Sequence, residues 1–118
     1  MSGQSYEVHA YLDRDAGYTS CIPSACIDDG LILVRLHCDG RDFRVANDDA
    51  QRILFVIGGE SFCQEVSCRA DDLGRVVADL SSSGLSKRVR YSCEIVIEND
   101  QPQEEYRYKT CDFYIVVI

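Results

Sequence analysis

Seven cysteines are the residues of this chain best suited to chemistry. They are Cys21, Cys26, Cys38, Cys63, Cys68, Cys93 and Cys111. Two pairs share a four-residue gap, in "CIPSAC" and in "CQEVSC". Thiolates at short spacing can bind zinc, but structural zinc knuckles mostly use two-residue gaps, so disulfides are the favoured prediction and zinc the alternative. In an oxidising compartment six of the seven could pair, and one would be left over.

The two histidines, His9 and His37, offer no thiol–imidazole pair. His37 is adjacent to Cys38, and neighbouring residues of a strand point to opposite faces of a sheet. The acidic clusters at 28–29 and 47–49 lack the alternating oxygen ligands and the distal glutamate of a calcium loop. No GxSxG, P-loop or dinucleotide motif is present. We therefore expect a protein that is not an enzyme, with no cofactor or metal and with both histidines at the surface.

Charge and hydropathy narrow the class of partner. Twenty acidic and twelve basic residues give a formal charge of −8, which disfavours nucleic acid and anionic membranes. No apolar run approaches the ~20 residues that cross a bilayer, so no membrane span is expected. A hydrophobic fraction of 46% in 118 residues is typical of one globular domain, which we expect to span 1–118. The expected partner is another protein, or a second copy that associates through strand edges.

The clearest structural pattern is the alternation in "RVRYSCEIVIEND", residues 88–100. One face would be buried, and the other, which includes Glu94, would be exposed to solvent. The residues expected to be buried are Val89, Tyr91, Cys93, Ile95 and Ile97. Because Cys93 would lie on the buried face, we expect it in the core. We expect it to form a disulfide rather than to stay a free thiol.

Further strands are expected at 6–12, 31–38, 52–57 and 61–66, and from 104 to 117. Asp39-Gly40 predicts a tight hairpin, and Pro102 predicts the turn that joins 88–98 to the last strands. Residues 73–80 fit either a short helix or a strand, and 13–30 are expected to be irregular. Many short strands without a long helix predict an all-β fold, namely an antiparallel sandwich stabilised by disulfides.

Three stretches together resemble the N-terminal domain of zona pellucida proteins (ZP-N), an immunoglobulin-like sandwich. They are "ACIDDGLILVRL", "ILFVIGGESFC" and "YSCEIVIEND…EEYRYKTC", within roughly 24–115. The resemblance implies that Cys26 pairs with Cys111. The family's third cysteine has no counterpart near "DLSSSG", and Cys93 lies inside the following strand instead. The other disulfide candidates are Cys63, Cys93, Cys21 and Cys68.

The expected function is an extracellular, non-enzymatic module for protein–protein contact. The resemblance implies a role in matrix filament polymerisation or in recognition at a cell surface. "SGQSYE" after Met1 has no features of a secretory signal, so an extracellular location requires that a signal has been removed. Two alternatives stay open: an unrelated secreted immunoglobulin-like binding or decoy domain, and a cytosolic protein with reduced or zinc-bound thiols.

Overall fold

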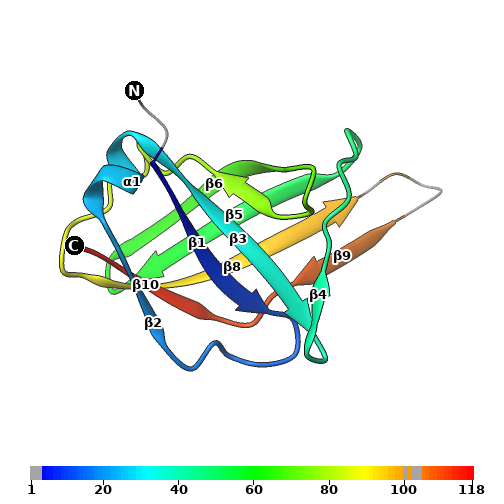
Figure 1. Ribbon diagram of the computed structural model, residues 1–118, viewed down its shortest axis with the longest axis horizontal. Helices are drawn as coiled ribbons and strands as arrows, with labels where there is room; N and C mark the ends of the chain where they lie inside the picture. Colours follow the sequence, from blue (N-terminus) through cyan, green and yellow to red (C-terminus); the bar gives the residue numbers. More distant parts are fainter. Residues whose placement is uncertain (1–3, 100, 102–104) are drawn as a thin grey trace.

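The computed structural model describes residues 4–99, 101 and 105–118, and it consists mostly of β-strands (Figure 1). The prediction of an all-β fold is confirmed. The elements are β1 (Gln4–Tyr11), β2 (Thr19–Ile22), α1 (Ser24–Asp28), β3 (Gly30–Cys38), β4 (Arg41–Phe43), β5 (Arg52–Gly59), β6 (Phe62–Ala70), β7 (Val76–Ala78), β8 (Arg90–Asn99), β9 (Tyr106–Lys109) and β10 (Phe113–Val117). In the described part of the chain, no helix is long and apolar enough to cross a membrane.

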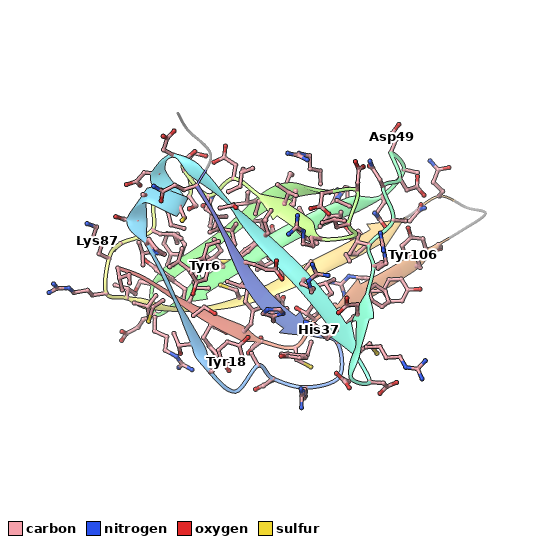
Figure 2. All side chains as sticks on the ribbon, in the orientation of Figure 1. Tyr6, Tyr18, His37, Asp49, Lys87 and Tyr106 are labelled. Carbon is pink, nitrogen blue, oxygen red and sulfur yellow. The ribbon has the colours of Figure 1, made fainter. Side chains whose placement is uncertain are left out.

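The strands form a single sheet that curls into a nearly closed barrel. Its order is β1-β3-β7-β6-β5-β8-β10-β2, with β4 paired to β3 and β9 paired to β8. The end strand β1 approaches the segment before β10, the strand next to the other end, where the Cys111 N–H donates to the Tyr11 carbonyl at 2.8 Å. Side chains fill the space inside the sheet, whereas Lys87 and Asp49 point away from it at opposite ends (Figure 2). The predicted division into two sheets and the predicted disulfides are not seen.

Two pairings differ from the antiparallel prediction, since β1 lies parallel to β3 and β10 lies parallel to β2. Parallel neighbours need a connection that carries the chain back across the sheet. The segment 12–29 provides that crossover. The prediction that 13–30 is irregular was wrong where β2 and α1 form. Because this segment is polar, its sequence did not predict β2 and α1, which tertiary contacts stabilise.

The alternation in β8 buries Tyr91, Cys93, Ile95 and Ile97, as predicted. Val89 is 41% exposed, so its predicted burial was wrong. The strand begins only at Arg90, and Arg88 has a φ of 65°, so the pleat does not extend back to residue 89. The core that β8 joins includes an edge-to-face pair of buried rings, Phe55 and Phe113, with centroids 5.5 Å apart.

The local turn predictions have mixed outcomes. Asp39 and Gly40 have φ values of 54° and 74°, as a two-residue hairpin requires, and Cys38 pairs with Arg41 across it. Within 73–80 the strand alternative is confirmed, because residues 76–78 form β7. Gly74 has a φ of 79° in the preceding turn, which excludes a helix there. The turn expected at Pro102 lies outside the described residues.

Candidate functional site

All seven cysteines are free thiols in the structure, with no pair at disulfide distance. Cys93 is 1% exposed, which confirms its placement in the core. In each CX4C pair the two cysteines differ in burial. Cys21 is exposed and Cys26 is buried, while Cys63 is exposed and Cys68 is half-buried. Burial raises the pKa of the Cys68 thiol to about 12. Neither pair therefore presents two thiolates to one ion or to each other.

Cys26 and Cys111, the pair implied by the resemblance, lie near opposite ends of β1. The Cys26 thiol lies 4.0 Å from the side-chain oxygen of Gln4, at the start of β1, and the Cys111 thiol lies 3.8 Å from the Leu12 carbonyl, just past its end. A strand rises ~3.3 Å per residue, so the two sites are more than ~20 Å apart. A disulfide needs Cα atoms within ~7 Å, so these two cysteines cannot bridge in this fold.

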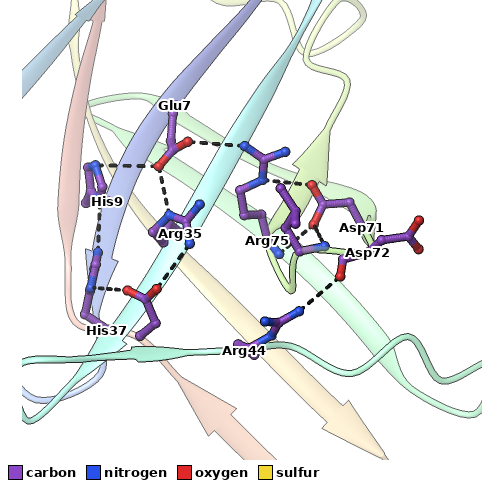
Figure 3. Close-up of polar contacts among 10 residues, drawn as sticks. Glu7, His9, Arg35, His37, Arg44, Asp71, Asp72 and Arg75 are labelled. Atoms are coloured by element: carbon purple, nitrogen blue, oxygen red, sulfur yellow. Dashed lines mark hydrogen bonds and ion pairs between the residues drawn. The ribbon is translucent and has the colours of Figure 1, made fainter.

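The largest polar cluster lies on the outer face of β1 and β3 (Figure 3). Nδ1 of His9 and Nε2 of His37 are 2.8 Å apart, so one ring donates a hydrogen bond to the other. Asp42 lies 3.5 Å from His37, and Glu7 accepts a 2.9 Å bond from Arg35. Sequence reasoning missed this contact because only the parallel register of β1 and β3 places the two histidines diagonally across from each other.

The cluster continues to Arg75, which contacts Glu7 at 3.3 Å and Asp71 at 2.8 Å. Each carboxylate thus faces a guanidinium, and bonds from Arg35 and Arg75 lower the pKa of Glu7. Burial lowers the pKa of His37, and repulsion from His9 adds to that effect. The contacts of the cluster join β1, β3 and β4 to the turn before β7. Within the described ranges, no three His, Cys, Asp or Glu residues converge as metal ligands.

The sheet has a gap along one side of β6. This strand pairs with β5 from Phe62 to Cys68, but β7 pairs with it only at Arg69 and Ala70. No other backbone hydrogen bond of the described residues involves 62–68. The free edge, defined as residues 62–68 of β6, is therefore an unpaired strand edge in an otherwise nearly closed barrel.

In an antiparallel pair, successive residues direct their N–H and C=O groups alternately to one neighbouring strand and to the other. This alternation determines which backbone groups point outward from the free edge. Ile95 donates its N–H to Oγ1 of Thr110, and its carbonyl accepts the Thr110 N–H, so both Ile95 groups face away from β5. Phe55, which is opposite Ile95, must then direct its own groups to Val66 on β6. Because the pattern alternates, Glu65 and Ser67 direct their N–H and C=O groups away from β5, and these groups have no backbone partner among the described residues.

A notch accompanies the free edge. It has a volume of about 400 Å³ and is lined by Leu31, Ser67, Cys68, Arg69, Val77 and Asp79. On the inner side of β6, Val66 and Cys68 pack against the core but stay half-exposed. An incoming strand would find main-chain partners along the edge and a notch beside it that is partly apolar and partly polar.

No family model matches this chain, and no curated protein matches it. Among solved structures, the chain is similar to the N-terminal domain of phage TP901-1 ORF48. The TM-score is 0.64 at 12% identity, over 96% of this chain and 97% of that one. At this identity the likeness shows a shared fold. Neither result bears on the ZP-N resemblance, which stays a prediction.

Proposed function

We propose that this protein is a non-enzymatic protein-binding module that adds a strand of its partner to the free edge of β6. The observation that carries the proposal is the unpaired edge at 62–68, flanked by β5 on one side only. Unpaired strand edges invite pairing with another chain, and proteins usually protect them with lysine, proline or a covering segment. The stretch "FCQEVSC" contains no lysine and no proline.

The polar cluster gives no support to a competing catalytic role. Its histidines and carboxylates are engaged with one another, with Arg35 and with Arg75. By contrast, the main-chain groups of Glu65 and Ser67 have no backbone partner in the described part of the chain, and both residues are exposed. Main-chain hydrogen bonds supply affinity in strand addition, and neighbouring pockets supply specificity.

The first test is hydrogen exchange of the free protein. The amides of Glu65 and Ser67 should exchange quickly, whereas that of Val66, bonded to β5, should be protected. Equal protection of all three amides would contradict the free edge. This measurement needs no partner.

The second test compares Ser67→Pro with Ser67→Ala in binding to a short alternating valine–threonine peptide. Proline removes the outward N–H without touching the β5 ladder, so it should abolish binding while the fold persists by circular dichroism. Alanine keeps the N–H and should bind normally. A proline variant that binds as well as the alanine variant would reject strand addition at β6.

The extracellular location is a separate proposal, and any disulfides that accompany it would require the cysteines to shift from their present positions, since no pair lies at disulfide distance. An oxidised protein would leave at most one titratable thiol, whereas a cytosolic protein with reduced thiols would leave seven. Thiol counting on the protein from its native source, in denaturant and without reductant, separates the two locations. Strand addition at β6 is compatible with either outcome.

A further inference from the structure

We infer that the partner strand is cationic, with a lysine or arginine placed opposite Glu65. This inference rests on the proposed strand addition and specifies its partner. Glu65 is the only charged residue of the free edge, and it lies near the middle of the stretch 62–68. It is exposed and has no ion-pair partner among the described residues.

The geometry of the edge directs this charge at the partner. Glu65 is one of the residues whose N–H and C=O point outward, and its side chain lies on the exterior face of β6 with those of Cys63 and Ser67. A residue paired directly with it would have its Cβ ~4.5–5.5 Å away. At that separation opposite charges attract and like charges destabilise the pairing.

A second copy of this chain fits the edge poorly. The free edge contains no lysine or arginine, so no register within it neutralises Glu65. The nearest cation on the strand is Arg69, and its edge is already paired with Val77 of β7. Two-fold pairing centred on Glu65 would place two glutamates directly opposite each other. The formal charge of −8 adds repulsion between copies and attracts a basic partner.

The inner face of the edge specifies the neighbouring partner residues. Residues of the partner that flank the cation point to the opposite face, towards Val66 and Cys68 and the notch that Leu31 and Val77 line. Leu31, Val66 and Val77 give this face an apolar part where an aliphatic side chain fits, while Ser67, Arg69 and Asp79 make the rest of the notch polar. The partner segment is thus an alternating strand with one cation outside and aliphatic residues inside.

The test uses two short labelled peptides that alternate valine and threonine, one with a central lysine and one with a central glutamate. Fluorescence anisotropy should show that the lysine peptide binds about tenfold more tightly, and the difference should shrink at high salt. Glu65→Gln should weaken the lysine peptide about fivefold, and Glu65→Lys should reverse the preference. Asp15→Asn, a change of an exposed carboxylate in the loop between β1 and β2, should leave both affinities unchanged.

The outcomes separate the two ideas. Equal binding of both peptides, abolished by Ser67→Pro, would overturn the cationic partner and leave strand addition in place. If neither peptide binds at millimolar concentration, both the inference and the proposed function fail. A concentration-dependent dimer of the free protein that Ser67→Pro dissolves would show that a second copy occupies the edge, and this would overturn the cationic partner.

Discussion

Thr110→Val should destabilise the barrel by about 2 kcal/mol. Thr110 is 2% exposed, and it bridges the point where β8 changes partner between β9 and β10. Its Oγ1 accepts the Ile95 N–H at 2.9 Å, in place of a ladder carbonyl. Valine has nearly the same shape but cannot accept that bond. A buried N–H left without a partner costs ~1–3 kcal/mol.

Chemical denaturation followed by circular dichroism measures this loss, and Thr110→Ser is the matched control. Serine keeps the acceptor and loses one methyl group, which costs ~0.8 kcal/mol. In a thermal melt, 2 kcal/mol corresponds to a decrease in Tm of about 8 °C for a domain of this size. Hydrogen exchange should localise the effect of valine to the Ile95 amide. If the valine variant is as stable as the serine variant, the hydrogen bond from the Ile95 N–H to Thr110 does not stabilise β8. The assignment of outward-pointing groups on β6, which starts from that bond, would then have no support.

Three further predictions concern the core, pH and the thiols. Ile95→Asp should unfold the domain by burying a charge. Glu94→Lys, on the outer face, should change the denaturation midpoint little, because the partly exposed ion pair of Glu94 with Lys109 contributes under ~1 kcal/mol. Burial lowers the pKa of His37, so the unfolded chain binds more protons than the folded one. The contribution of His37 to the free energy of unfolding should be complete above about pH 6.5 and should fall as the pH decreases through the lowered pKa of the folded state. The urea midpoint of His37→Gln should depend less on pH. In the reduced native protein, exposed Cys63 should react quickly with a thiol reagent. Cys93 should react only on unfolding, because burial raises the pKa of its thiol. Rapid labelling of Cys93 would contradict its placement in the core.

The strands themselves could be predicted from the sequence because their evidence is local. Period-two alternation identified β8 and the burial of Ile95, and Asp39-Gly40 identified the β3–β4 hairpin. The alternation misled at Val89, where the backbone leaves the pleat, and Glu94, predicted to be exposed, is half-buried. Pleat and turn geometry depend on a few neighbouring residues, so a single sequence contains them.

Which strands become neighbours was decided by the tertiary structure. The parallel pairing of β1 with β3 brings His9 against His37, and it separates Cys26 from Cys111 by the length of β1. Neither fact has a local cause, since residues of the same type and spacing could pair in many registers.

The free edge is also a product of the tertiary structure. The sequence "FCQEVSC" reads as an ordinary strand, and it becomes an edge only because β7 is three residues long and covers β6 at Arg69 and Ala70 alone. Its composition determined that the edge has one negative charge and no cation. Whether that charge faces a neighbour or solvent depends on how a closed sheet distributes its hydrogen bonds, and that is settled only when all the strands are in place.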